Sequence, residues 1–118
     1  MLPHLWQRPA TRKHWPDGVA EHDGKPPTVF FAKDFVVNRL TGKRISEMSD
    51  MSGAGLLDLA ARRYDRTLME AYGLADCMDL LPPLIESADI AGTVTQAVAL
   101  ETGLAAGTPV VGGLFDVV

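Results

Sequence analysis

The sequence is short of several residue types, and each shortage excludes a class of function. Cys77 is the single cysteine among 118 residues, so no disulfide can form within the chain and we expect a reducing, cytoplasmic compartment. No uninterrupted apolar run approaches the roughly 20 residues of a membrane span, so we expect no membrane partner. The net charge of −4 argues against a nucleic-acid partner, because such proteins normally present a basic face.

Positive charge is also missing from the C-terminal part of the chain. No Lys or Arg follows Arg66, and neither a G-x-x-x-x-G-K-[ST] loop nor a G-x-G-x-x-G turn occurs anywhere. The bland interpretation is a solvated acidic face. A phosphate-binding surface in this half would need backbone amides, or cations from outside the chain.

Nucleophilic and metal chemistry have little support in the sequence. The stretch around Ser52 resembles a nucleophile elbow but lacks its first glycine, and no histidine follows His22. Cys77 stands beside Asp76 and Asp79, whose negative charges oppose formation of the reactive thiolate. The three histidines have no i, i+4 pair and no neighbouring cysteine, so we expect no metal ligands.

Composition divides the chain into two parts. Residues 1–27 contain all three histidines, both tryptophans and five of the eight prolines, and they show neither helical nor strand periodicity. We interpret this part as an irregular or poorly ordered N-terminal segment. Residues 28–118 carry the regular patterns and are expected to form the folded part.

The folded part begins with patterns typical of a helix and short strands. Apolar residues at helical spacing predict an amphipathic helix over Thr28–Thr41, ended by Gly42; its apolar face would comprise Val29, Phe31, Ala32, Phe35, Val36 and Leu40. A short extended piece is expected at 44–47. The apolar run 56–59 is too short for periodicity to separate a strand from a helical turn.

Further along, capping residues and glycines mark two more helices. Asp65 is a good N-cap for a helix that stops at Gly73, and Thr95 for one that stops at Gly103. The pair of prolines predicts an extended stretch over 80–83. The β-branched run 108–111 predicts a buried strand, ended by a double glycine. This alternation of helices and strands favours an α/β fold.

Asp116 is the candidate functional residue that remains. It follows the predicted strand and the glycine pair Gly112-Gly113, where ligands usually bind in open α/β sheets. The glycines would let a substrate approach the backbone. The alternative, which the local sequence alone favours, is that Asp116 caps a following helix.

The stretch from Phe31 to Asp116 resembles the second half of the N-terminal domain of the FGGY carbohydrate kinases. The matching motifs occur in the family's order: Lys33-Asp34-Phe35 with Arg39-Leu40-Thr41-Gly42, then Ser49-Asp50-Met51-Ser52-Gly53-Ala54, Leu80-Leu81-Pro82-Pro83, Glu86-Ser87, Ala91-Gly92-Thr93-Val94, Gly103-Leu104 and Gly107-Thr108-Pro109-Val110. Residues 28–118 are therefore expected to be a partial kinase N-terminal domain.

This resemblance implies a ribonuclease H-like, actin-like ATPase fold and transfer of the γ-phosphoryl group of ATP, with Mg²⁺, to a sugar or polyol. It implies that Asp116 is the catalytic base and a substrate ligand, next to Gly113 and Phe115. Phe115 either shapes the sugar pocket or packs in the core beneath it. The strand end Gly113–Val118 resembles the subgroup that acts on L-xylulose, related keto-sugars or erythritol.

The resemblance also sets limits on what these residues do alone. The family's metal-linked hairpin and most of its nucleotide pocket have no counterpart in the matched motifs, so we expect the isolated 118 residues to be inactive. The alternative function is a non-catalytic remnant or a stand-alone α/β interaction module. A homodimer stays open as a partner arrangement.

Overall fold

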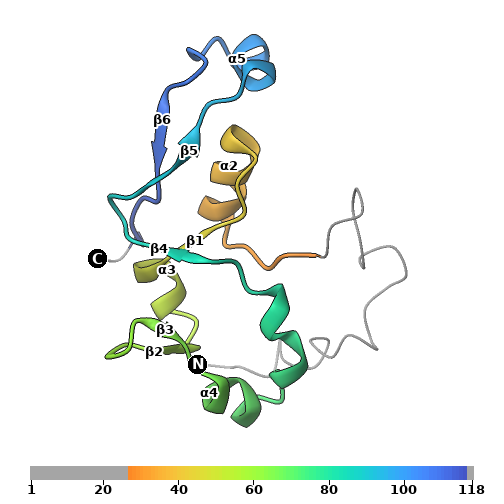
Figure 1. Ribbon diagram of the computed structural model, residues 1–118, viewed down its shortest axis with the longest axis vertical. Helices are drawn as coiled ribbons and strands as arrows, with labels where there is room; N and C mark the ends of the chain where they lie inside the picture. The colour runs from red at the N-terminus through yellow and green to blue at the C-terminus, as the bar shows by residue number, and fades with distance from the viewer. Residues whose placement is uncertain (1–26, 117–118) are drawn as a thin grey trace. The chain divides into compact units, whose positions relative to one another are not determined.

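The computed structural model describes residues 27–116 (Figure 1). The expectation for the segment 1–27 therefore lies almost entirely outside the described residues. The described residues divide into two compact units, 27–29 with Gly55–Leu81, and Phe30–Ala54 with 82–116.

The first unit contains a short hairpin followed by two helical turns. Strands β2 (Leu57–Asp58) and β3 (Arg63–Tyr64) pair antiparallel and lead into α4 (Arg66–Ala71) and the 3-10 helix η3 (Ala75–Leu80). Its buried apolar side chains are Leu56, Leu57, Met69, Leu74, Cys77 and Leu80. Within the ambiguous run 56–59, Leu57 and Asp58 form a strand and Leu59 begins a turn.

Capping in this unit follows the sequence. The Asp65 carboxylate accepts hydrogen bonds from the amides of Thr67 and Leu68 at 2.7 and 3.1 Å, which confirms it as the N-cap. The expectation of an extended stretch over 80–83 is wrong at its start, because Leu80 closes η3; Leu81 is extended, with φ −80° and ψ 128°. Proline restricts only the residue directly before it.

The second unit alternates helices with strands. Its elements are α2 (Ala32–Thr41), β1 (Ser46–Glu47), α3 (Met48–Ser52), β4 (Leu84–Ile85), β5 (Ile90–Thr93), α5 (Gln96–Thr102) and β6 (Pro109–Val111). Strands β1 and β4 pair parallel with Ser46 opposite Leu84, and β5 and β6 pair antiparallel with Thr93 opposite Pro109. The fold is α/β, as expected. No helix among residues 27–116 is both long and apolar enough to span a bilayer.

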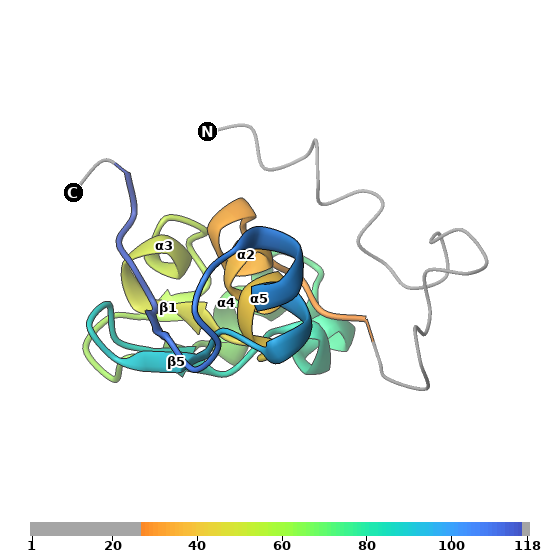
Figure 2. The ribbon, with the colours of Figure 1, turned by 90° about the horizontal axis from the view of Figure 1, so that it is seen from above.

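Helix α2 packs beside the β5–β6 ribbon, as Figures 1 and 2 both show. The amide of Thr95 donates to the Leu40 carbonyl at 3.1 Å. A Cβ on Gly92 would lie 2.9 Å from Cβ of Thr41, so only glycine fits this close approach. The predicted glycine stop is confirmed, because Gly42 has φ +74°.

Two expectations about burial are wrong. The buried face of α2 consists of Asp34, Val37 and Thr41, whereas Phe35 and Val36 are each 55% exposed. Asp34 can be buried because the Lys33 ammonium and the Ser46 hydroxyl contact its carboxylate. Strand β6 is also not buried, since Pro109 and Val111 face solvent and only Val110 is half-buried. Helix α2 begins at Ala32 rather than Thr28.

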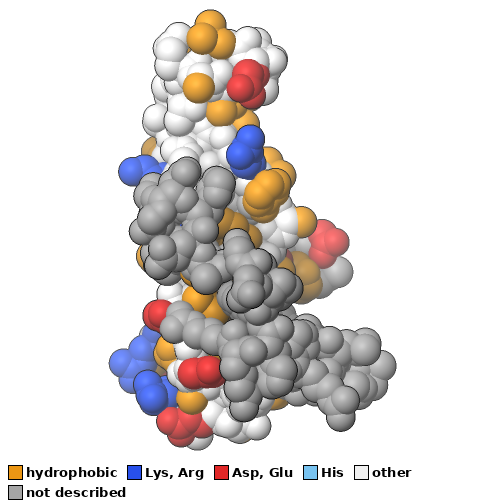
Figure 3. All heavy atoms as spheres, turned by 90° about the vertical axis from the view of Figure 1, so that its right-hand side faces the viewer, with side chains coloured by type: hydrophobic (Ala, Val, Ile, Leu, Met, Phe, Trp, Pro, Cys, Tyr) orange, Lys and Arg blue, Asp and Glu red, His pale blue; other side chains and the backbone are white. Residues whose placement is uncertain are grey.

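The α5 end of this unit carries hydrophobic side chains at its surface (Figure 3). Leu100 and Leu104 are 79% and 47% exposed. Thr95 caps α5 through a hydrogen bond from the Val98 amide at 3.3 Å, and Gly103 ends it with φ +78°, as predicted. The buried charged side chains lie elsewhere in the unit, on α2, β1 and α3.

Candidate active site

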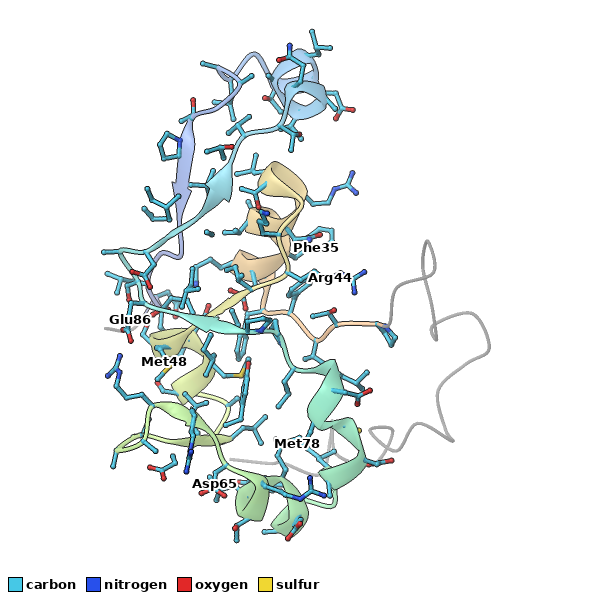
Figure 4. The ribbon with its side chains drawn as sticks, viewed as in Figure 1. Phe35, Arg44, Met48, Asp65, Met78 and Glu86 are labelled. Carbon is cyan, nitrogen blue, oxygen red and sulfur yellow. The ribbon has the colours of Figure 1, made fainter. Side chains whose placement is uncertain are left out.

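A lysine surrounded by three carboxylates forms the polar centre of the second unit. The ammonium nitrogen of Lys33 lies 3.5 Å from Asp34 Oδ1, 3.6 Å from Glu47 Oε2 and 3.3 Å from Asp50 Oδ2. The Lys33 side chain is 24% exposed, whereas those of Asp34 and Glu47 are fully buried. Such a cluster is costly to desolvate, and the single lysine charge offsets part of the repulsion among the three carboxylates. Met48 and Glu86 are labelled in Figure 4: Met48 begins α3, and Glu86 directly follows the last residue of β4.

Glu47 caps the short helix α3 from the end of β1. Its carboxylate accepts bonds from the Ser49 amide at 2.7 Å, the Asp50 amide at 3.2 Å and the hydroxyls of Ser49 and Ser87 at 2.6 Å each. Burial raises the pKa of Glu47, but these hydrogen bonds outweigh it and lower the pKa from 4.5 to about 2. Glu47 is therefore an anion at neutral pH.

The two aspartates of the cluster differ in their surroundings. Burial raises the pKa of Asp50, and the Lys33 charge only partly offsets this while Asp34 and Glu47 add to it. Asp34 accepts the Ser46 hydroxyl at 2.6 Å and the Phe31 amide at 3.4 Å through Oδ2. Among residues 27–116 its Oδ1 has no hydrogen-bond partner, and the Lys33 ammonium lies 3.5 Å from it.

Four hydrogen bonds hold the segment that follows β6 against neighbouring parts of the second unit. The Gly112 amide donates to the Asp89 carbonyl at 3.0 Å, and the Gly113 amide donates to the Ser87 carbonyl at 3.0 Å. Lys33 Nζ donates to the Gly112 carbonyl at 2.8 Å. The Phe115 amide donates to the Ser49 hydroxyl oxygen at 2.9 Å. The chain from Gly112 to Phe115 therefore follows a path set by neighbouring elements.

Glycine is required at the start of this segment. A Cβ on Gly112 would lie 2.9 Å from the Glu86 carbonyl oxygen and 3.2 Å from Glu47 Cγ. Gly113 has φ +82°, a conformation that favours glycine, and its Cβ position lies 3.1 Å from Lys33 Cδ. The double glycine allows the chain to pass close to β4 and Lys33.

Of the residues predicted to form the site, Gly113 and Phe115 belong to this fastened segment and Asp116 follows it directly. Asp116 is exposed, and Phe115 is half-buried with its ring 3.4 Å from the position of a Cβ on Gly53. Sequence reasoning missed the roles of Lys33, Glu47 and Ser87. Asp34 lies on the buried face of α2, and a buried carboxylate needs a compensating cation, but this position is visible only in the fold and not in the sequence pattern.

Comparison with known proteins decides the family. The model of the FGGY family of carbohydrate kinases, N-terminal domain, matches residues 11–118. The chain belongs to this family. The match includes residues 11–27 as well as the expected part, so the boundary at Thr28 stays a prediction.

Curated relatives and solved structures agree with this assignment. The L-xylulose/3-keto-L-gulonate kinase of Escherichia coli is 43% identical over 90 residues, which are 76% of this chain and 18% of that protein. The autoinducer-2 kinase of Klebsiella pneumoniae is 37% identical over 93 residues, 79% of this chain and 17% of its own. A Brucella ovis xylulose kinase structure superposes with a TM-score of 0.65 at 36% identity, covering 75% of this chain and 18% of that one. The chain thus spans less than a fifth of the length of these FGGY proteins.

The described residues do not fit the Mg²⁺ ion that accompanies ATP in such kinases. Among residues 27–116, no three His, Cys, Asp or Glu side chains are arranged to hold a metal ion. Asp34, Glu47 and Asp50 come closest, but the Lys33 ammonium already stands among them, 3.3 to 3.6 Å from an oxygen of each.

Proposed function

We propose that this chain supplies part of the N-terminal, ribonuclease H-like domain of a cytoplasmic kinase that phosphorylates a sugar or polyol hydroxyl with ATP. The observation that carries the proposal is the FGGY family match over residues 11–118. The relatives that are named L-xylulose kinases support it. ATP, with Mg²⁺, would bind mostly outside the described residues.

Asp116 acts as the general base in this proposal. As the sugar oxygen forms its bond to the γ-phosphorus and the bond to the β–γ bridging oxygen breaks, the Asp116 carboxylate accepts the hydroxyl proton. ADP leaves with the bond's electron pair. The exposed position of Asp116, directly after a segment held by four hydrogen bonds, supports this role because a base must be both reachable and aimed.

The proposed substrate is L-xylulose or a related keto-sugar. Two arguments support it: the strand end from Gly113 onward resembles that subgroup, and relatives at 41% and 43% identity are named L-xylulose kinases. Gly113 and Phe115 would border the sugar. Autoinducer-2 is the competing substrate, because relatives with that name reach 39% identity.

A segment swap tests the proposal. Residues 28–118 would replace the matching segment of the Escherichia coli L-xylulose/3-keto-L-gulonate kinase, a chimera that we call the swap kinase. We expect ATP-dependent phosphorylation of L-xylulose. A folded swap kinase, verified by circular dichroism, that phosphorylates no sugar would contradict the proposal and favour the non-catalytic module.

To test the substrate assignment, the segment must be placed in a kinase that is named for a different substrate. The same residues would be placed in the Klebsiella pneumoniae autoinducer-2 kinase. We expect the ratio of kcat/KM for L-xylulose over autoinducer-2 to rise relative to the parent. An unchanged ratio in an active chimera would show that these residues do not select the sugar.

A further inference from the structure

We infer that Lys33, Glu47 and Ser49 are positioning residues that hold the segment Gly112–Phe115 and so aim Asp116. This inference rests on the proposed function for its catalytic consequence. The structural part stands on hydrogen bonds and ion pairs within the second unit alone.

Lys33 holds the beginning of the segment. Its ammonium group donates to the Gly112 carbonyl at 2.8 Å, and its stem lies beside Gly113. The ammonium is in turn held by Asp50, Asp34 and Glu47 at 3.3 to 3.6 Å. These carboxylates are buried on α2, β1 and α3. They therefore restrict the position of the Lys33 ammonium, a restriction that a surface lysine would not share.

Ser49 holds the end of the segment. A hydroxyl has one proton and can rotate, so its direction depends on its partners. Here the proton goes to Glu47 Oε2 at 2.6 Å, and the oxygen accepts the Phe115 amide at 2.9 Å. Glu47, as an anion, can only accept, so it orients the Ser49 oxygen toward the amide that directly precedes Asp116.

Glu47 joins the two ends. The carboxylate lies 3.6 Å from Lys33 Nζ through Oε2 and accepts the Ser87 hydroxyl at 2.6 Å through Oε1. The Ser87 carbonyl accepts the Gly113 amide in the middle of the segment. One buried carboxylate thus connects three of the four contacts that fix the path to Asp116.

Amide hydrogen exchange on the 118-residue chain tests the structural part by NMR. We expect Ser49→Ala to speed exchange of the Phe115 amide by roughly tenfold, the scale of one lost hydrogen bond. Ser49→Thr keeps the hydroxyl and should restore protection. Ser52→Ala is the matched control, because Ser52 is an exposed serine of the same helix α3 whose hydroxyl bonds to the Ser49 carbonyl instead.

The Val94 amide, which donates to the Thr108 carbonyl, is the internal reference. It distinguishes local opening around Phe115 from unfolding of the whole unit. Faster exchange at Phe115 with Val94 unchanged supports the inference. Unchanged exchange at Phe115, or equal acceleration in Ser52→Ala, would overturn it.

Kinetics of the swap kinase test the catalytic part. Misplacing the base should lower kcat by about 10- to 100-fold in Ser49→Ala with KM for sugar nearly unchanged, and Ser49→Thr should recover most of the loss. Equal kcat in Ser49→Ala and Ser52→Ala, or a change confined to KM, would overturn the inference. An inactive unsubstituted swap kinase would instead contradict the proposed function, and the exchange experiment would still decide the role of Ser49.

Discussion

The hydroxyl oxygen of Ser49 accepts the backbone amide of Phe115 at 2.9 Å, although 66 residues separate them in sequence. The bond connects the short helix α3 to the chain just before Asp116. Together with the bond from Lys33 to Gly112, it makes the polar centre of the second unit part of the candidate active site.

Removing the Lys33 charge should destabilise the chain strongly. Lys33→Met keeps the length of the side chain but leaves three buried carboxylates without their cation, which typically costs about 3–5 kcal/mol. Urea unfolding would measure the loss. Lys43→Met is the control, because Lys43 is exposed and a surface change usually stays within about 0.5 kcal/mol. Equal stability of both variants would show that the cluster needs no cation.

Acid should weaken the fold through Glu47. Its pKa is about 2 when folded and 4.5 when free, so its contribution is fully present above pH 4.5 and is lost as pH falls toward 2. The loss is on the order of 3 kcal/mol. Glu47→Gln should therefore flatten the fall of unfolding free energy between pH 5 and pH 2, measured by urea titration at each pH.

Asp50→Asn provides a control of opposite sign. The pKa of Asp50 is raised in the fold, so its protonation stabilises the folded chain as pH falls through the raised value toward 3.8. Removing this carboxyl should make the acid-induced loss steeper rather than flatter. If both variants flattened the profile equally, the assignment of the two pKa shifts would be wrong.

The first unit offers a simpler test of capping. Asp65→Ala removes the acceptor for the amides of Thr67 and Leu68 and should cost about 1 kcal/mol of unfolding free energy. Asp65→Asn should retain most of the stability because its side-chain oxygen can still accept. A loss as large in the asparagine variant would point to the charge rather than to the cap.

The sequence was sufficient to predict local features but not the polar centre. Caps such as Asp65 and Thr95, and glycine stops such as Gly42 and Gly103, depend on residues close in sequence, and all four are confirmed. The face of α2 was predicted wrongly because periodicity counts apolar residues, whereas Asp34 is buried through partners on other elements. Glu47 and Ser87 meet only after folding, since 40 residues separate them.

The roles of Asp116, Phe115 and Gly113 remain predictions from the resemblance. Hydrogen bonds at Gly112, Gly113 and Phe115 explain the path of the chain toward Asp116. Recognition of the sugar and the nucleotide depends on residues that are distant in sequence, which local sequence patterns do not reveal. Lys33 belongs to the family motif, but its contacts with Gly112 and with three carboxylates become visible only in the fold.

The most direct test of the account is kcat of the swap kinase with Asp116→Asn. Asparagine has similar size but cannot take the hydroxyl proton as a carboxylate does, so we expect kcat to fall by about 10²- to 10⁴-fold while sugar binding, measured by calorimetry, persists. Asp76→Asn, which changes an exposed carboxylate in the other unit, should leave kcat unchanged. Wild-type turnover in the Asp116→Asn variant would contradict the assignment of Asp116 as the base.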